Sequence, residues 1–419
     1  MTDIFVKVLY DISVLGLGHF HLRARTGIYR AIEQIAYGLA ESKECEVAFC
    51  ASQGNYAECL EYFRANTRWA NRGAMSPYNL LFKMDSLTGH FSPRTFLYGA
   101  LKRLRSGSNA ALNRLPKVDL EKTDIYHSTF YPVPGKMRSS KKMKIFQTVY
   151  DLIPILHPEF FKFNEDHLIK KVLKAIGRDD FVICISESTK RDLCNYRKDI
   201  DADKVFVISL AASESFYQCT DHDRLSAVKR KYNIPADRRY ILSVCTLEPR
   251  KNIEQSIRSF VRLITEQKID DLCLVLTGTK GWDYNKIFKE ISHSIQVKEK
   301  IILTGYVPDE DLAPLYSGAV MFVYPSFYEG FGLPPLEAMQ CGTPVIASNT
   351  SSLPEVVSDA GIMVDPMDGD AVCQAMLDLY NKPSLRQTMS LKSLERAGQF
   401  SWKKCTLYTI NAYKAALGN

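Results

Sequence analysis

Short apolar runs recur along the chain and predict β-strands. Each run is rich in β-branched or aromatic residues and ends at turn residues, as strands covered on both faces do. In the first half, the expected strands are residues 5–12, 45–51, 124–127, 144–150, 181–185 and 205–209. Apolar residues recur with helical spacing at 28–39 and around 165–176. Strands that alternate with helices predict a parallel sheet with crossover helices.

The same pattern restarts after the polar stretch 218–239. The second set of expected strands is 240–246, 272–278, 301–305, 321–325 and 344–348, with a helix at 253–265. The predicted fold class is α/β, with two doubly wound, Rossmann-like domains that face a cleft. Ligands of such domains bind at the carboxyl ends of the strands.

We expect an N-terminal domain at 1–215 and a C-terminal domain at 236–398. We expect residues 399–419 to form an amphipathic C-terminal helix, which either crosses back to the first domain or packs locally. A chain of 419 residues is long enough for two domains with a core of their own.

Charge is distributed unevenly along the chain. The net charge is +7, but residues 64–117 hold ten Lys or Arg against one acid, Asp85. Aromatic and leucine residues are interleaved with these cations. This mixture is typical of a surface that faces anionic lipid headgroups or an acidic acceptor, and a solvated, partly disordered insertion is the alternative.

Cysteine usage and the apolar runs limit the class of protein. The eleven cysteines stand singly in apolar segments, which favours reduced core thiols. No apolar run approaches the roughly 20 residues that span a bilayer, and the segment MTDIFVKVLY lacks the basic start of a signal peptide. We therefore expect a cytoplasmic protein, either free or peripheral at the inner face of the cell membrane.

The segment PSFYEGFGLPPLEAMQCGTPVIAS, residues 325–348, carries the first candidate site. A strand ends at Pro325, a glycine loop follows, and two prolines open a helix that reaches about Cys341. A loop that leads into a helix N-terminus favours phosphate. Glu329 and Glu337 stand on either side of the loop, so they can bind different ends of an extended ligand. Two exposed acids beside a turn are the alternative.

The segment TLEPRKNI, residues 246–253, directly follows a predicted strand. Arg250 and Lys251 in this turn can neutralise a diphosphate at the carboxyl end of the sheet. Solvent-exposed charges near a helix start are the alternative.

Other phosphate and metal motifs are weak. The GxG at Gly16 lacks the third glycine of a dinucleotide fingerprint, and no P-loop occurs. The HxH of His19 and His21 has no further ligand nearby, and the acidic triplets of 199–203 form a polar loop before a strand. We expect no metal and no cofactor.

The motifs EPRKNI, LVLTG, LTGYVPDEDL, the 325–348 segment and AGIMVDP, in this order, resemble the retaining glycosyltransferases of family four, including a mannosyltransferase-like group. The second half resembles them strongly. The first half does so weakly, through TGIYR, YHSTFYPVP, TVYDLIP and ISESTKRDL. The resemblance implies the GT-B fold and metal-independent transfer of a sugar from a nucleotide sugar, with retention at the anomeric carbon.

The resemblance also implies roles for individual residues. Glu329 would contact the donor sugar and Glu337 the ribose, while Arg250 and Lys251 would stabilise the departing nucleoside diphosphate. The remaining substrate-binding residues would be Gly27, beside the phosphates; Tyr306, near the base; and Phe331, Gly332 and Leu333, through backbone N–H groups at the diphosphate.

Two positions depart from the family. Many relatives carry a histidine in a T-x-H pattern where this chain has Tyr150, and tyrosine is a poorer acid or base near neutral pH. Asp151 and His127 are the candidates for that histidine's task, and each can instead be structural. Cys245 stands where some relatives have a phosphate-contacting arginine.

The sequence therefore predicts a hexosyltransferase of surface polysaccharide or lipopolysaccharide synthesis, which extends a glycan or lipid-linked glycan and binds no nucleic acid. The EPRKN and TVYDLIP motifs lead us to expect GDP-mannose as the donor, with mannose as the transferred sugar. The alternatives are a non-catalytic nucleotide-sugar-binding subunit of an assembly complex, or a nucleotide-sugar epimerase.

Overall fold

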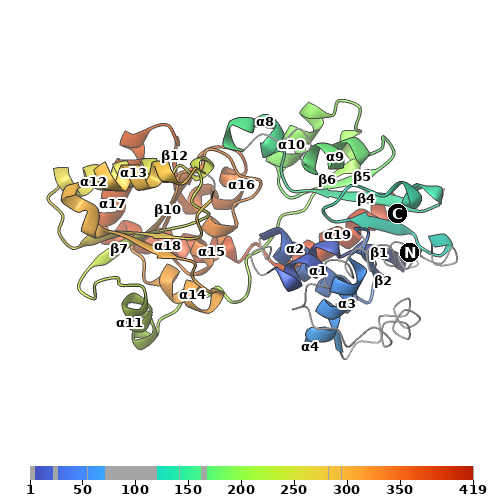
Figure 1. Cartoon of the computed structure of the whole chain (residues 1–419), viewed down its shortest axis with the longest axis horizontal. Coiled ribbons are helices and arrows are strands. Elements are labelled where there is room, and N and C mark those ends of the chain that lie inside the picture. The colour runs from blue at the N-terminus through green and yellow to red at the C-terminus, as the bar shows by residue number, and fades with distance from the viewer. Residues whose placement is uncertain are drawn as a thin grey trace, which may run out of the picture.

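The chain has two halves, and each is built around a parallel sheet (Figure 1). The computed structural model describes residues 5–21, 27–53, 55–70, 120–140, 142–161, 168–281, 283–293 and 295–418. Most of the basic aromatic stretch, residues 71–117, lies outside the described residues, so its predicted role stays a prediction.

The first sheet has six strands in the order β2-β1-β3-β4-β5-β6. Each neighbouring pair is parallel. The strands are β1 (Val6–Asp11), β2 (Cys45–Cys50), β3 (Ile125–Ser128), β4 (Lys144–Val149), β5 (Phe181–Cys184) and β6 (Val205–Val207). The helices of this half are α1 (Ser13–Phe20), α2 (Gly27–Glu41), α3 (Tyr56–Ala65), α4 (Thr67–Ala70), α8 (Ile153–Leu156), α9 (Leu168–Ala175) and α10 (Glu187–Tyr196).

The second sheet also has six strands, in the order β12-β11-β10-β7-β8-β9, again all parallel. The strands are β7 (Arg239–Val244), β8 (Leu272–Thr277), β9 (Ile301–Gly305), β10 (Met321–Tyr324), β11 (Val345–Ser348) and β12 (Gly361–Val364). The helices are α11 (His222–Lys231), α12 (Ile253–Glu266), α13 (Asn285–His293), α14 (Asp309–Ser317), α15 (Leu333–Gln340), α16 (Leu353–Val357), α17 (Gly369–Asn381), α18 (Pro383–Ala397) and α19 (Trp402–Ala416).

Central strands of the second sheet are buried along their whole length because helices cover both faces. Every residue of β8, LCLVLT, is buried, and so is every residue of β10 and β11. Helix α12 packs Ile257, Phe260 and Leu263 into the core from one face. Mostly apolar side chains on both sides of a strand are what a doubly wound sheet requires.

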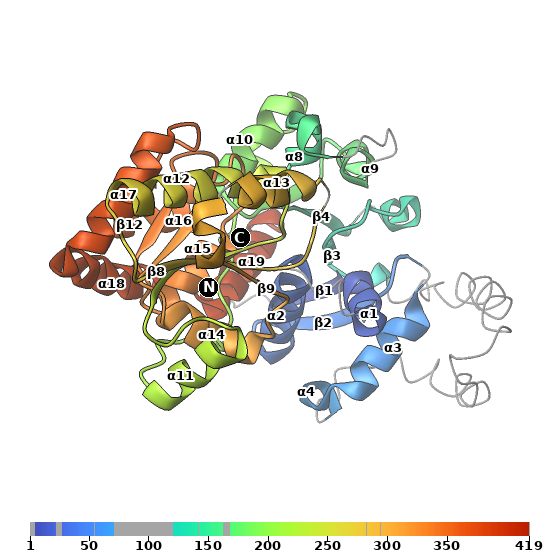
Figure 2. The same ribbon diagram turned by 60° about the vertical axis from the view of Figure 1, so that its left-hand side comes forward.

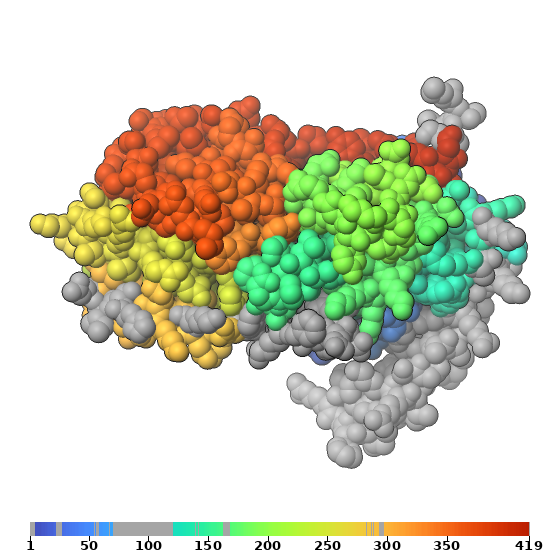
Figure 3. Space-filling view, turned by 90° about the horizontal axis from the view of Figure 1, so that it is seen from above, coloured from blue at the N-terminus to red at the C-terminus, as the bar shows by residue number. Residues whose placement is uncertain are grey.

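The last helix, α19, crosses back to the first half. It packs against α2 and β1, and Figure 3 shows this C-terminal segment lying across the first half of the molecule. Ser401 caps the helix by accepting a hydrogen bond from the Lys404 N–H at 3.2 Å. Gly38 of α2 lets the helices approach, because a Cβ there would collide with Thr406. Of the two alternatives for this helix, crossing back is therefore correct.

The predicted fold class is confirmed, and so are the predicted strands, to within one or two residues at their ends. One strand, β12, was not predicted. It is a four-residue edge strand that begins with a glycine and is only partly buried, so it lacks the apolar run of the others.

None of the eleven cysteines forms a disulfide, and all but Cys194 are buried, as the sequence predicted. Within the described ranges, no helix has the length and apolar character needed to cross a membrane.

Candidate active site

Three charged side chains meet where β7 and β10 end. Lys251 Nζ donates to Glu329 Oε1 at 2.6 Å, and Arg250 NH1 lies 2.7 Å from Glu329 Oε2. Both cations belong to the short 3-10 helix Pro249–Lys251 that follows β7, whereas Glu329 lies in the loop between β10 and α15. Residues 78 positions apart in the sequence therefore share one cluster.

Burial of this cluster excludes two alternatives that the sequence left open. The side chains of Arg250, Lys251 and Glu329 are 13%, 10% and 10% exposed, so the cations are not solvent-exposed charges at a helix start. Glu329 and Glu337 are both buried, so they are not two exposed acids beside a turn.

The turn that carries the cations is fixed by Asn252. Its backbone is left-handed, at φ 54°, a conformation that asparagine tolerates better than most residues. Its side-chain amide donates to the carbonyls of Pro325 and Pro366, at 3.1 and 2.8 Å. The turn after β7 is thereby tied to the loop after β10.

The cluster keeps its charges although it is buried. Burial raises the pKa of Glu329, but attraction to Arg250 and Lys251 outweighs that cost and lowers the pKa to about 2. Burial would lower the pKa of Arg250, and attraction to Glu329 and Glu248 holds it above its ordinary value. Glu329 and Arg250 are therefore ionised at neutral pH.

The two oxygens of Glu329 differ in their surroundings. Oε1 accepts from Lys251, from Ser326 Oγ at 2.6 Å and from Tyr324 OH at 2.9 Å. Oε2 forms the ion pair with Arg250, and a carboxylate oxygen accepts about two hydrogen bonds. Oε2 therefore keeps the capacity to accept a ligand hydroxyl.

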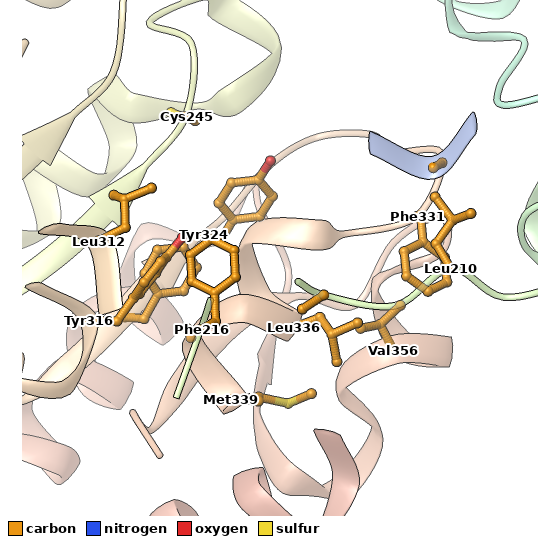
Figure 4. Packing of buried hydrophobic residues seen from close by; sticks show 14 of the residues in the cluster. Leu210, Phe216, Cys245, Leu312, Tyr316, Tyr324, Phe331, Leu336, Met339 and Val356 are labelled. Atoms are coloured by element: carbon orange, nitrogen blue, oxygen red, sulfur yellow. The ribbon is translucent and has the colours of Figure 1, made fainter. Parts of the chain in front are cut away.

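Helix α15 holds the second glutamate. It begins after Gly332, whose φ of 123° favours glycine, and prolines occupy its first turn. Glu337 lies on its buried side, where Oε2 accepts from Tyr316 OH at 3.1 Å. Figure 4 shows Tyr316, Tyr324 and Phe331 among the buried side chains that support this region.

The carboxylate of Glu337 is poorly compensated. Burial raises its pKa to about 7, against the opposing effects of Arg30 and of the Tyr316 hydroxyl. The nearest cation is Arg30 of α2, whose NH1 lies 3.7 Å from Oε1. Glu337 thus changes charge near physiological pH.

We predict that Glu337→Gln is more stable than the wild type above neutrality. Because the pKa is raised in the folded state, this carboxyl contributes stability that is fully present below its ordinary pKa of about 4.5 and is lost as the pH rises through about 7. The melting temperature of the variant should exceed that of the wild type by about 2 °C or more at pH 8, and the gap should close by pH 5. The exposed control Glu266→Gln should have the melting temperature of the wild type at both pH values. A higher melting temperature for the wild type than for Glu337→Gln at pH 8 would contradict the prediction.

The loop between the two glutamates is fixed from the α16 side. Ser351 Oγ accepts from the Glu329 N–H at 2.9 Å, and Ser352 Oγ donates to the carbonyls of Glu329 and Phe331, at 2.9 and 2.7 Å. The Phe331 ring is buried. The loop backbone and the start of α15 at Leu333 therefore form a rigid unit.

The first half contacts this loop at Gly330. The Gly330 carbonyl accepts from Ser186 Oγ and Thr189 Oγ1, at 2.8 and 3.3 Å. A Cβ on Gly330 would lie 2.5 Å from the Tyr150 carbonyl oxygen and 3.0 Å from the Asp151 Cβ. The end of β4 thus packs directly on the glycine loop.

This contact brings Asp151 to the charged cluster. Burial raises the pKa of Asp151; Glu329 also raises it, whereas the Ile153 N–H, Arg250 and Lys251 lower it. A carboxyl with a raised pKa beside two cations suits hydrogen bonding or proton exchange with a hydroxyl. The structure therefore places Asp151 with Glu329, Arg250 and Lys251.

We predict that Gly330→Ala lowers kcat/KM for the reaction of this site about tenfold or more, because displacement of a site by about 1 Å can cost 100-fold. The added methyl would meet the Tyr150 backbone, which cannot move aside as a flexible side chain can. Kinetics and small-angle scattering would show a less active, more open protein. Gly135→Ala is the matched control, since nothing lies within 4 Å of its Cβ. Equal kcat/KM for Gly330→Ala and wild type would contradict the prediction.

His127 has different neighbours. Its ring nitrogens lie 2.6 Å from Tyr413 OH and 2.7 Å from Thr148 Oγ1, within the first sheet and against α19. Burial lowers its pKa to about 3. These contacts favour the structural alternative for His127, whereas Asp151 keeps its candidate role.

The remaining predicted substrate-binding residues, Gly27 and Tyr306, lie at the start of α2 and just after β9. Gly27 begins α2, and a Cβ there would lie 2.7 Å from Leu333 Cδ1 at the start of α15. Tyr306, just after β9, is 71% exposed. Cys245 is a buried thiol close enough to Lys251 for that charge to affect its pKa, which burial raises to about 12.

The acidic residues of the 199–203 loop have structural partners. Asp199 pairs with Arg197 at 2.7 Å, and Asp201 caps the short helix Ala202–Lys204. Across the described residues, no group of three or more His, Cys, Asp or Glu side chains is arranged to hold a metal ion.

Four side chains of the site were not singled out from the sequence. Tyr324 and Ser326 bind Glu329, Glu248 pairs with Arg250 at 2.8 Å, and Arg30 pairs with Glu337. Only Glu248 had a sequence signal, as the acid next to the EPRKN cations. Tyr324 and Ser326 lie within five residues of Glu329, whereas the partner of Arg30 belongs to the other half of the chain.

Comparisons with known proteins identify relatives of this chain. The family model described as "Glycosyl transferases group 1" matches residues 226–396. The "O-antigen chain mannosyltransferase B" of Escherichia coli is 36% identical over 294 residues, which cover 69% of this chain and 74% of that protein. The "Serotype-specific mannosyltransferase WbdA" of Escherichia coli is 32% identical over 274 residues, which cover 64% of this chain but only 33% of that protein.

Solved structures show the same fold at low identity. The sucrose-phosphate synthase of Thermosynechococcus elongatus superposes with a TM-score of 0.67 at 19% identity, covering 98% of this chain and 99% of that chain. Anabaena HepE, solved "in complex with UDP and glucose", superposes with a TM-score of 0.66 at 15% identity, covering 98% of this chain and 100% of that chain.

Proposed function

Because the chain belongs to the group 1 glycosyltransferases, the family-four type with the GT-B fold, we propose that it transfers a hexose from a nucleotide sugar, with retention and without a metal. One observation carries this proposal: the buried cluster of Lys251, Arg250 and Glu329 at the strand ends, with the start of α15 beside it. Fixed cations and a helix N-terminus are what a departing diphosphate needs.

The charged cluster and the start of α15 supply most of what the sugar-transfer step requires. The bond between the anomeric carbon and the β-phosphate oxygen breaks, and its electron pair stays on the phosphate. Lys251 and Arg250 stabilise that charge, together with the N–H groups at the start of α15. The acceptor hydroxyl forms the new bond from the same face and passes its proton to the leaving phosphate oxygen, so retention requires no side-chain nucleophile.

Glu329 has two tasks in this scheme. It holds Lys251 and Arg250 in position through its two oxygens, and Oε2 accepts a hydroxyl of the donor sugar. Asp151, which is close to the cluster, contacts the acceptor hydroxyl or the sugar. Among the described residues, Arg250 Nε is buried without a hydrogen-bond partner, which suits a side chain that rearranges when an anion binds.

The nucleoside end lies along α15. Glu337 accepts a ribose hydroxyl, the backbone at Phe331, Gly332 and Leu333 faces the diphosphate, and Tyr306 borders the base. Gly27 gives the start of α2 close access to the same end of α15.

We propose mannose from GDP-mannose as the donor, and a glycan or lipid-linked glycan of surface polysaccharide as the acceptor. The support is the likeness to two relatives whose names describe mannosyltransferases, one of O-antigen chains and one serotype-specific. The reaction would take place at the cytoplasmic face of the membrane, where residues 64–117 would contact acceptor or lipid.

The experiment is a donor panel with a stereochemical readout. Purified protein is incubated with GDP-mannose, UDP-glucose and dTDP-rhamnose and with glycan acceptors, and NMR records the anomeric configuration of the product. We expect release of nucleoside diphosphate and a product with the donor's configuration. An inverted product would overturn retention. Conversion of the donor without acceptor would indicate an epimerase, and binding without turnover a non-catalytic subunit.

A further inference from the structure

Arg30 joins the two halves at the nucleoside end of the site. It lies one turn into α2, three residues after Gly27, so both residues face the same way from the helix. Gly27 packs against Leu333 at the start of α15, and Arg30 extends to α14 and to the next turn of α15. Figure 2 shows α2 beside α14, although the two helices belong to different sheets.

The two terminal nitrogens of Arg30 face different acids. Its NH2 group donates to both oxygens of Asp309, at 2.6 and 2.7 Å, while NH1 faces Glu337 Oε1 at 3.7 Å. Asp309 is the first residue of α14, just after the loop that carries Tyr306. One guanidinium therefore contacts the base side and the ribose side of the proposed nucleoside site.

The distance between Arg30 NH1 and Glu337 Oε1 decides whether that oxygen can still accept a hydrogen bond. At 3.7 Å the guanidinium stabilises the charge of the carboxylate but is too far away to use a lone pair of Oε1. Oε2 is already bonded to Tyr316. Oε1 therefore stays able to accept a hydroxyl, while the charge of Arg30 favours the ionised form of the carboxyl, which accepts it best.

We propose that Arg30 is a positioning residue that brings the first domain onto the nucleoside end of the donor site and favours the charged form of Glu337 for the ribose of a nucleoside diphosphate. This inference rests on the proposed function. Arg30 contacts neither of the cations that serve the diphosphate. Nucleotide affinity should therefore depend on Arg30, whereas the chemical step should not.

The pH dependence follows from the groups around Glu337. Arg30 from α2 lowers its pKa, Asp309 from α14 raises it, the Tyr316 hydroxyl from α14 lowers it, and Cys341 lies at the end of its own helix. Removal of Arg30 raises the pKa of Glu337 further. At neutral pH a larger fraction of Glu337 is then protonated, and at high pH the carboxylate returns.

The test is calorimetric titration of GDP and UDP into wild type, Arg30→Gln and Arg30→Lys between pH 6 and 9, with kcat measured at saturating donor. For the nucleotide that the wild type binds, Arg30→Gln should raise Kd about tenfold at pH 7, and the gap should narrow to about threefold or less at pH 9. Arg30→Lys should recover part of the affinity, and kcat should stay within about twofold for both variants.

Other outcomes separate the two proposals. If the wild type binds neither nucleotide and transfers no sugar, the proposed function fails and this inference fails with it. If the wild type is active and the Kd of Arg30→Gln equals that of wild type at every pH, only the role of Arg30 fails. A fall in kcat with unchanged Kd would also overturn it. Arg262→Gln, an exposed ion-paired arginine on α12, is the matched control and should change neither quantity.

Discussion

Replacement of Lys251 with methionine should lower kcat for sugar transfer about 100-fold to 1000-fold. Methionine has a similar length and fits the buried position, but it carries no charge. Negative charge grows on the diphosphate as the bond to the sugar breaks, and Lys251 is the more buried of the two cations at that point. Solvent cannot compensate for a charge that is removed from this buried position.

The effect should appear in kcat more than in the affinity for the donor, because the leaving group gains its extra charge only in the transition state. Lys229→Met is the matched control. Lys229 donates to the carbonyls of Ala236 and Arg238 in the same half of the protein and has no contact with the cluster. A kcat for Lys251→Met within about threefold of the control would remove Lys251 from the chemistry.

Glu329→Gln should reduce both stability and activity. The glutamine keeps the shape of the side chain but leaves Arg250 and Lys251 without their shared counter-charge, and breaking a buried ion pair costs about 3–5 kcal/mol. The free energy of unfolding, from urea denaturation at pH 7, should fall by that order. Because the two cations lose their fixed position and an uncharged amide accepts a sugar hydroxyl less strongly than a carboxylate, kcat/KM should fall about 100-fold or more.

The two readouts distinguish positioning from packing. Glu266→Gln, an exposed glutamate paired within α12, should leave stability and turnover unchanged. If Glu329→Gln lowered the free energy of unfolding but the folded variant kept the wild-type kcat, the cluster would have a structural role only. Intact turnover in Glu329→Ala would have the same meaning.

Most of the fold could be predicted from the sequence because the strands at the centre of each sheet are continuous apolar runs. Strands such as β8 and β10 are buried at every position, so the apolar runs predict their boundaries to within one residue. The partly buried edge strand β12 has no such run and was missed. The amphipathic pattern of α19 showed that one face is buried, but amphipathicity does not identify the partner. That partner, α2, is fixed by close packing at Gly38 and Thr406.

The site was predictable as separate segments and not as a cluster. The glycine loop, α15 and the EPRKN turn were recognisable because backbone geometry dictates their residues. The ion pairs of Glu329 with Lys251 and Arg250 depend on the adjacency of β7 and β10 in the sheet, which strand order along the chain does not reveal. Arg30 was missed for the same reason, since its partners belong to the other half.

The central claim is that this chain moves a sugar from a nucleotide sugar at the Lys251 and Glu329 cluster. The most direct measurement incubates the purified protein with GDP-mannose and a mannose-terminated acceptor glycan, and follows GDP release together with the mass of the acceptor. We predict that the acceptor gains one hexose for each GDP released, and that Lys251→Met nearly abolishes both. Equal rates in wild type and Lys251→Met, or no transfer by the wild type from any nucleotide sugar of the donor panel, would contradict the account.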